Sequence, residues 1–294
     1  MNNAQISTQS MDTIIRMQRN EITEQAIYTK IAARVKDEHN RSILLRIAAE
    51  ERAHYEVWKL YTHREIKPQQ LKVIWHSLLS VVLGFTFAIK LMENGERIAQ
   101  NVYSQLILEV PQASEITAQE DAHEQELMEL LDEERLKYVG SMVLGLSDAL
   151  VELTGTLAGL TLAMQNTRLI ALSGLITGIS ATLSMASSEF LSARSEGRAD
   201  AFKSCLYTGI AYIITVALMV LPYLLFADAN YMWALGTMIV IVVAIIAVFN
   251  YYLSVAKSKP FRRSFLEMVG ISLGVAVIAF GIGLLVKQFL GIDI

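Results

Sequence analysis

The stretch at residues 141–164, SMVLGLSDALVELTGTLAGLTLAM, decides the fold class of this 294-residue chain. It is longer than the roughly 20 mostly apolar residues that a helix needs to cross a bilayer, and its only charged side chains are Asp148 and Glu152. The sequence therefore predicts an all-α integral membrane protein with a five-helix transmembrane domain, because four further apolar stretches follow, at about 169–191, 205–227, 232–254 and 267–290.

Ionisable side chains are distributed unevenly along the chain. Residues 1–138 hold 16 Lys and Arg against 21 Asp and Glu, whereas residues 139–294 hold 9 and 8. This division predicts two domains, a soluble one over 1–138 and a transmembrane one over 139–294 whose partner is the lipid bilayer. Nucleic acid is not an expected partner, because neither half has the basic composition of a nucleic-acid-binding protein. The single Cys205 excludes an internal disulfide framework.

The connectors between the apolar stretches alternate in charge. The connectors at 192–204 and 255–264 carry seven Lys and Arg between them, the one at 165–168 carries a single Arg, and the one at 228–231 carries none. The positive-inside bias then predicts a cytoplasmic N-terminal domain and an outside C-terminus. The polar N-terminus, which has no signal-peptide pattern, agrees with this orientation. We expect a multi-pass protein of a prokaryotic cytoplasmic membrane.

The first two predicted spans contain acidic side chains, which are costly in lipid unless they are partnered or hydrated. Asp148 and Glu152 lie four residues apart and so share a helix face, and Glu189 lies near the cytoplasmic end of the second span. Antiparallel helices joined near 166–167 place Asp148 at about the depth of Met185. A carboxylate and a thioether at one level suit a moderately soft divalent ion, although a methionine that only packs is the alternative. These four residues form the candidate transport path.

The first 138 residues predict a helical bundle with long helices at about 11–35, 38–63, 71–108 and 113–137. Each helix has a stripe of apolar positions three and four residues apart, and carboxylates or imidazoles interrupt every stripe. Burying an unpaired carboxylate is very costly. Four helices that do so together therefore predict a shared positive charge in the core.

The interrupting residues match the ligand inventory of a two-metal bundle, with Glu-x-x-His on two helices and Glu on the other two. A single Glu-x-x-His motif usually lies on a solvated helix face. Two such motifs, together with glutamates at core positions of both other helices, are specific for a two-metal site. The sequence predicts a metal centre whose ligands are Glu21, Glu51, His54, Glu93, Glu96, Glu120 and His123.

Around these residues the first domain resembles the rubrerythrin branch of the ferritin-like superfamily. The matching features are Glu21 with Tyr28, the run Glu50-Glu51-Arg52-Ala53-His54, the Glu93/Glu96 pair, and Glu120 with His123. The resemblance implies a ferritin-like four-helix di-iron bundle with two irons per site, which reacts with peroxide or oxygen and in which one third-helix Glu changes its coordination. Rubrerythrins usually add a four-cysteine iron centre, which this chain lacks. Ferrous oxidation, iron sensing or iron delivery is therefore favoured over sustained peroxidase turnover.

The second domain resembles the vacuolar iron transporter family. The resemblance rests on residues 143–148, VLGLSD, and residues 185–195, MASSEFLSARS. It implies Fe²⁺/H⁺ antiport along a path that Asp148 and Met185 line at a dimer interface. The chain departs from the family pattern at Ala149, where Gly is usual, and in lacking glutamate-rich helices between the second and third spans. Together the two resemblances indicate a membrane-bound ferritin type of fusion.

These features favour an exporter that moves Fe²⁺, with Mn²⁺ as a second candidate, from the cytoplasm to the outside by proton antiport. The bundle would capture iron for it, with a role in iron homeostasis and oxidative stress. One alternative is a membrane-anchored di-iron enzyme that reduces peroxide or oxygen, with ferroxidase or peroxidase-like activity. Another is a bundle that only senses iron or peroxide and gates the transporter.

The connection between the second and third helices leads to a prediction about assembly. The connector at 64–70 is too short to return along the second helix, and a continuous helix over 71–108 would carry Glu93 and Glu96 beyond their own helix pair. We therefore expect a homodimer that exchanges ferritin-like helices, unless residues 71–89 form a return leg. Residues 73–89 are apolar enough for a sixth span, but a span there would separate the two half-sites, and we reject it.

Overall fold

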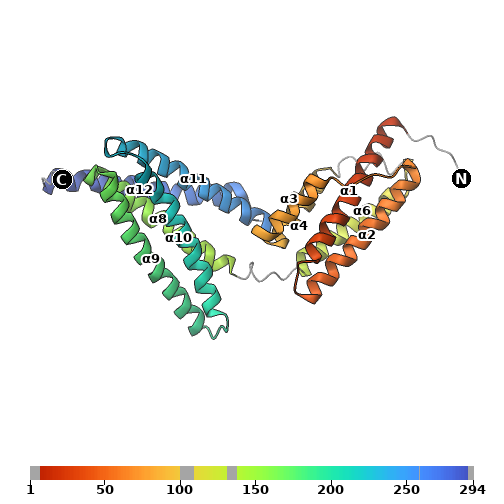
Figure 1. Cartoon of the computed structure of the whole chain (residues 1–294), viewed down its shortest axis with the longest axis horizontal. Coiled ribbons are helices and arrows are strands. Elements are labelled where there is room, and N and C mark those ends of the chain that lie inside the picture. The colour runs from red at the N-terminus through yellow and green to blue at the C-terminus, as the bar shows by residue number, and fades with distance from the viewer. Residues whose placement is uncertain (1–6, 100–108, 131–137, 258, 291–294) are drawn as a thin grey trace. The chain divides into compact units, whose positions relative to one another are not determined.

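The protein is all-α, as predicted. The computed structural model describes residues 7–99, 109–130, 138–257 and 259–290, and these ranges contain helices and no strand. The chain divides into two compact units, Met1–Glu133 and Glu134–Ile294. Figure 1 shows the helices of the first unit in red to yellow-green and those of the second in green to blue.

The first unit begins with two long helices, α1 (Thr8–Ala32) and α2 (Glu38–Thr62), which pack against each other. Each starts at a side-chain cap: Ser7 accepts a hydrogen bond from the Ser10 amide, and Asp37 accepts one from the Asn40 amide. Such caps satisfy amides that have no partner within the helix. They define where the two helices begin, and the hairpin that the helices form carries three of the seven predicted metal ligands.

The continuous third helix predicted over 71–108 is wrong within the described residues. The chain instead forms α3 (Gln70–Val82) and α4 (Phe85–Ala99), and α3 packs against both α1 and α4. The break lies at Leu83–Gly84, where Gly84 has a φ of 99°. Glycine adopts positive φ at no steric cost, so it can turn the chain where other residues would be strained.

The helices of the first unit share an apolar interior that leaves room for polar ligands in its middle. One cluster includes Ile31, Leu44, Ile89 and Leu127, from α1, α2, α4 and α6 (Gln112–Leu130). A second cluster includes Ile14, Trp58 and Ile116. On α1, α2 and α6 the predicted ligands lie in sequence between the residues of the two clusters, so the apolar packing on both sides holds them inside the unit.

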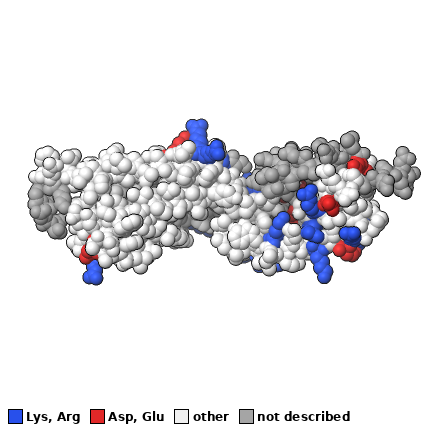
Figure 2. Space-filling view, turned by 90° about the horizontal axis from the view of Figure 1, so that it is seen from above, with Lys and Arg blue, Asp and Glu red and all other residues white. Residues whose placement is uncertain are grey.

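The second unit consists of five long helices, as predicted: α8 (Val139–Met164), α9 (Thr167–Ser195), α10 (Ala201–Leu225), α11 (Tyr231–Ala256) and α12 (Phe261–Leu290). All five are long and apolar enough to cross a membrane, and no other described helix is. The protein is therefore an integral membrane protein. Its second unit presents an almost uninterrupted uncharged surface in Figure 2, with charged side chains confined to a few places.

Small residues allow close packing among these helices. A Cβ added at Gly178 of α9 would lie 2.4 Å from Val216 of α10, and one added at Gly283 of α12 would lie 2.6 Å from the Gly159 carbonyl of α8. Any larger residue would push the helices apart. Close approach through glycine is typical of membrane helices, which have no hydrophobic drive to associate in lipid.

Candidate metal centre

Four predicted ligands from three helices converge inside the first unit. Glu21 of α1, Glu51 and His54 of α2, and Glu120 of α6 each offer one ligand atom, and these atoms all lie within 4.8 Å of one another. Glu21, Glu51 and His54 are buried, and the Glu120 side chain is only 12% exposed. These residues are buried because they occupy positions in the apolar stripe of each helix, which faces the interior of the unit.

His54 directs one ring nitrogen at the carboxylates and the other away from them. Its Nδ1 lies 2.8 Å from Glu120 Oε1, 3.7 Å from Glu21 Oε2 and 3.8 Å from Glu51 Oε2. Its Nε2 donates to Gln119 Oε1 at 2.7 Å. Metal-ligating histidines commonly use their second nitrogen in this way, which sets the ring orientation and the tautomer.

His123 has a similar arrangement on the other side of the cluster, although its contact with Glu50 does not have hydrogen-bond geometry. Its Nδ1 lies 3.6 Å from Glu51 Oε1 and 3.8 Å from Glu120 Oε2, while its Nε2 lies 2.5 Å from Glu50 Oε2. The rings of His54 and His123 stack with their centroids 5.9 Å apart. Both imidazoles therefore present Nδ1 to the shared carboxylates.

Glu50 and Gln119 are not among the ligands predicted from sequence, yet their positions carry a signal. Each directly precedes a ligand glutamate, so α2 and α6 both contain an acidic or amide residue followed by Glu-x-x-His. The contacts are reciprocal, because Gln119 of α6 holds His54 of α2 and Glu50 of α2 contacts His123 of α6. Only the pairing of α2 with α6 reveals this relation.

The cluster fits a metal ion by its unsatisfied atoms. Glu51 Oε2, His54 Nδ1, Glu120 Oε1 and His123 Nδ1 are all buried without a hydrogen-bond partner, and the 2.8 Å contact of His54 with Glu120 does not have hydrogen-bond geometry. Each such buried polar atom costs about 1–3 kcal/mol. Carboxylate oxygens with imidazole nitrogens suit iron or manganese, and metal coordination would satisfy these atoms.

The pKa values of these groups describe the charge balance without a metal. Burial raises the pKa of Glu21, and the nearby Glu51 carboxylate adds to the rise. Burial acts in the same direction on Glu51, but the nearby imidazoles of His123 and His54 outweigh it and lower the pKa of Glu51 to about 2. Burial opposes protonation of His123, but Glu120 and Glu51 raise its pKa to about 10, and the carboxylates also raise the pKa of His54. Protonated imidazoles thus supply the counter-charge.

The other two predicted ligands lie on α4. Glu93 accepts a hydrogen bond from the buried Tyr28 hydroxyl and is not among the four converging residues. Burial, followed by the charges of Glu93 and Glu51, raises the pKa of Tyr28, so its phenol lies near both carboxylates. The side chain of Glu96 is outside the described residues. A second metal position therefore stays a prediction.

In the second unit, Asp148 and Glu152 of α8 face α10. The Tyr212 hydroxyl donates to Glu152 Oε2 at 2.8 Å, and Tyr212 also interacts with Asp148. Tyr212 is fully buried, whereas Glu152 is exposed and Asp148 is half-buried on the single chain. A tyrosine in an apolar span is not by itself a sign of a functional site. The contact of Tyr212 with the acidic pair could therefore be found only from the packing of α8 against α10.

The other two path residues lie on α9. Glu189 accepts hydrogen bonds from Ser141 at 2.7 Å and from Ser204, and Arg198 lies 3.8 Å from the same oxygen. Met185 is half-buried and packs against the apolar core of the second unit. Glu189 thus joins α8, α9 and α10 at their ends, and the predicted proximity of Met185 to Asp148 stays a prediction.

Comparison with known proteins relates part of the chain to a protein family. No curated protein and no solved structure shows a significant match to the chain. Residues 139–200 match the model of the VIT family. The two motifs that resemble vacuolar iron transporters, at 143–148 and 185–195, both lie inside this range. The chain therefore carries a VIT family domain at residues 139–200, which comprise α8, α9 and the connector to α10, and this domain indicates metal transport across a membrane.

Proposed function

We propose that this protein exports Fe²⁺, with Mn²⁺ as a second substrate, from the cytoplasm to the outside in exchange for protons. The observation that carries the proposal is the buried cluster of unsatisfied ligand atoms at Glu51, His54, Glu120 and His123 on a chain that also has a VIT family domain. A bundle that binds metal would have little use on a membrane anchor alone. It would serve a transporter directly, because it concentrates the substrate on the side of uptake.

The first unit acts in this proposal as a ferritin-like metal-capturing domain. Glu21, Glu51, His54 and Glu120 would hold one ion, and Glu51, Glu120 and His123 with Glu93 or Glu96 would hold a second. Iron bound there would supply ferrous–ferric redox chemistry. The chain's own contribution is to position the ligands. Gln119 and Glu50 set the imidazoles, and Trp58 donates to Glu21 Oε1 at 2.9 Å.

The second unit provides the path for the ion, with Asp148 as ligand and proton carrier and the Met185 thioether as a softer ligand. Glu152 is exposed on the single chain although it lies in a membrane-spanning helix. A carboxylate that faces lipid is costly. A second copy that covers this face of α8 would remove that cost, which supports a homodimer with the path at the subunit interface.

Metal flux into proteoliposomes tests the transport proposal. The purified full chain would be reconstituted with a metal-sensitive dye and a pH dye inside the vesicles, and Fe²⁺ would be added under anaerobic conditions. We expect metal entry coupled to proton exit in the fraction of proteins whose first unit faces the added metal. A Glu267→Ala chain is a matched control, since Glu267 is an acidic residue of α12 that pairs with Arg263 outside the path. Vesicles with wild-type protein that take up no more metal than empty vesicles would overturn the proposal.

A second candidate is a membrane-anchored di-iron enzyme that reduces oxygen or peroxide. The buried Tyr28 phenol, hydrogen-bonded to Glu93 and close to Glu51, favours it because a phenol beside a redox metal can supply an electron and a proton. Oxygen or peroxide consumption by the iron-loaded full chain in detergent measures this activity directly. Sustained consumption without metal flux in vesicles would select the enzyme over the exporter.

A further inference from the structure

One helix of the first unit exposes an apolar face. Leu71, Ile74, Trp75 and Leu78 lie on α3 with the spacing i, i+3, i+4 and i+7, which places them on one side of a helix. Their side chains are 85%, 56%, 55% and 53% exposed, while Val73 and Ser77 on the opposite side are buried. α3 is thus held to the bundle by one side and presents large apolar residues on the other. Contiguous exposed apolar patches of this kind mark interaction sites.

The segment that contains this face carries basic residues and no acidic ones. Residues 66–92 contain Lys67, Lys72 and Lys90 and no Asp or Glu, although acidic residues outnumber basic ones over residues 1–138. A pocket of about 480 Å³ lies at the N-terminal end of α3, and its lining includes three basic residues, Arg19, Arg64 and Lys67. The apolar face therefore adjoins a local excess of positive charge.

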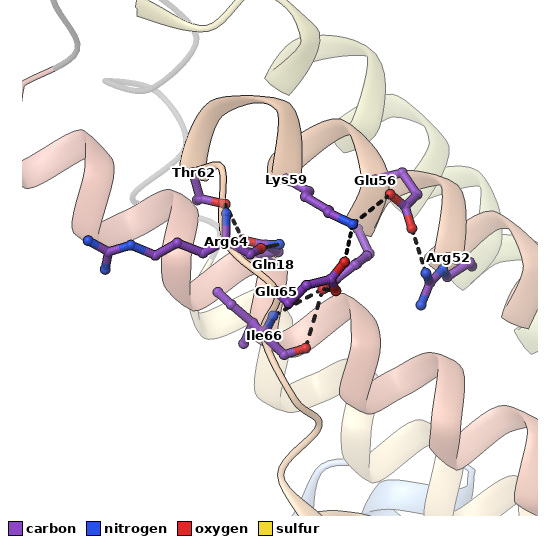
Figure 3. Close-up of polar contacts among 9 residues, drawn as sticks. Gln18, Arg52, Glu56, Lys59, Thr62, Arg64, Glu65 and Ile66 are labelled. Atoms are coloured by element: carbon purple, nitrogen blue, oxygen red, sulfur yellow. Dashed lines mark hydrogen bonds and ion pairs between the residues drawn. The ribbon is translucent and has the colours of Figure 1, made fainter.

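The connector that forms this pocket is held in place by hydrogen bonds (Figure 3). The Arg64 carbonyl accepts from Gln18 Nε2 at 2.9 Å, and the Ile66 amide donates to the Tyr55 hydroxyl at 3.0 Å. Glu65, the one acidic residue in the lining, pairs with Lys59 and accepts from Tyr55. The Arg64 guanidinium extends away from these contacts in Figure 3. The connector is thus held in one conformation, and the acidic residue in the pocket lining is already paired.

We propose that α3 lies on the anionic lipid surface of the membrane that the chain's own spans cross. Leu71, Ile74, Trp75 and Leu78 would sit at the boundary of headgroups and acyl chains. The phosphates would contact Lys72 and the pocket's basic residues. An amphipathic helix with tryptophan and leucine on one face and lysine beside it is the usual form of an interfacial helix, and anionic lipids attract such basic segments.

The length of α3 excludes a membrane-spanning role. Its 13 residues extend about 20 Å, less than the roughly 30 Å of the hydrocarbon core, and the turn at Gly84 ends it. A lipid surface is also always within reach, because the chain carries five spans and only eight residues separate Leu130 of α6 from Val139 of α8. The geometry therefore fits a helix that lies on the membrane.

A second copy of the chain fits this face less well. Two-fold dimers bring the same patch of each subunit together, so the patch must complement itself. Here the segment at 66–92 offers lysines and no acidic residue to pair with them. An anionic bilayer supplies both an apolar phase and the negative charge that the patch lacks.

Site-directed spin labelling of the full chain tests the proposal. Cys205, the only cysteine, is replaced by serine, and a nitroxide is attached at Leu78→Cys of α3 or, as the matched control, at Leu60→Cys of α2, which is 71% exposed in the same unit. The protein is placed in nanodiscs of phosphatidylcholine with phosphatidylglycerol. We expect the label at position 78 to lie about 5–10 Å below the phosphates, accessible to oxygen and shielded from a water-soluble nickel chelate. The label at position 60 should remain in water.

Further measurements separate the possible results. With phosphatidylcholine alone, or with Lys67→Glu and Lys72→Glu combined, the nickel accessibility of the label at position 78 should rise several-fold toward that at position 60. Equal nickel accessibility at both positions in anionic nanodiscs would overturn the proposal. A label at position 78 that is shielded from oxygen and nickel alike, with dipolar broadening independent of lipid charge, would also overturn it and assign the face to a second copy. Both labelled positions are exposed, so neither label enters the bundle core.

Discussion

At the scale of single residues, the bundle site is defined as much by the groups behind the ligands as by the ligands. Gln119 and Glu50 occupy the outer nitrogens of His54 and His123, so both Nδ1 atoms remain directed at the carboxylates. Each of the two residues belongs to the helix opposite the histidine that it contacts. The association of α2 with α6 therefore assembles the ligands and their supports together.

Replacing these supports should weaken metal binding without removing a ligand. We expect Gln119→Leu and Glu50→Leu each to lower Fe²⁺ or Mn²⁺ affinity by about 10- to 100-fold, the usual effect of losing a partner of a ligating histidine. Metal titration of the full chain in detergent measures this loss. Glu56→Leu is the control, because Glu56 lies on α2 but pairs with Arg52 on the surface. Affinity in the Gln119 variant equal to that of the control would refute the supporting role.

Metal binding and metal-free stability should respond oppositely to pH. The pKa of His123 is raised from 6.5 to about 10, so its stabilising contribution is complete below pH 6.5 and is lost as pH rises toward 10. Metal affinity should increase over the same range, because the ion displaces the imidazole proton. Thermal unfolding of the chelator-treated full chain between pH 6.5 and 10 measures the first effect. In a His123→Gln chain this slope should be reduced, and an unchanged slope would contradict the assignment.

At the scale of elements, the position of one glycine determines how the first unit closes. Gly84 turns the chain between α3 and α4, and Ala88, Ile89 and Met92 of α4 then pack in the same core as residues of α1 and α2. A continuous helix over 71–108 would have carried these residues away from the core that they share with α1 and α2. The turn lets α3 pack against α1 while α4 enters the core of the unit.

A side chain at Gly84 should loosen this region. Gly84→Ala forces a residue with a Cβ into positive φ, at a cost of about 1–2 kcal/mol. We expect amide exchange in α3 and α4 to accelerate by about fivefold or more, since local opening follows local stability. Hydrogen-exchange mass spectrometry of the full chain measures this, with Ser80→Ala on α3 as the control. Exchange rates unchanged from wild type would show that the turn is not strained by a side chain.

At the scale of the whole molecule, the chain combines two units whose acidic side chains lie in different media. The first surrounds its ligands with an apolar core and the second carries its acidic pair on a membrane-spanning helix. The compactness of each unit implies that a lesion in one leaves the site of the other intact. Transport, by contrast, should require both.

Substitutions in the path should separate binding from transport. We expect Asp148→Ala to stop metal flux in proteoliposomes while metal binding by the bundle remains at the wild-type level. Met185→Leu keeps the volume but removes sulfur, so flux should fall or the preference between Fe²⁺ and Mn²⁺ should change. Metal flux and metal binding, measured on the same preparations, show whether a substitution affects transport alone. Wild-type flux through the Asp148 variant would rule out the proposed path.

Mixed subunits test whether the bundle closes within one chain. Glu51 and Glu120 converge in the single chain, so a Glu51→Ala chain co-assembled with a Glu120→Ala chain should recover no metal binding. In a homodimer that exchanges helices, one composite site would lose both groups and the other would remain intact. Metal stoichiometry of verified heterodimers, purified by two different tags, distinguishes the cases. Recovery of about half the wild-type binding would establish the exchange.

The sequence by itself determined the features that depend on local periodicity and hydropathy. Five spans follow from apolar length, and the inward faces of Glu21, Glu51, His54 and Glu120 follow from positions three and four residues apart. Both signals lie within one helix. They need no knowledge of the neighbouring helices, and they led to the all-α class and to the core of the metal centre.

Only the tertiary structure decided which helices supply the partners. Gln119 beside His54, Tyr212 beside Glu152 and the serines around Glu189 join residues that are 15 to 65 positions apart. Helical periodicity fixes the face of a side chain but not the helix opposite it, nor the rotation and depth at which two helices pack. For the same reason the turn at Gly84 escaped the sequence pattern, since glycine marks a turn only where packing requires the chain to reverse.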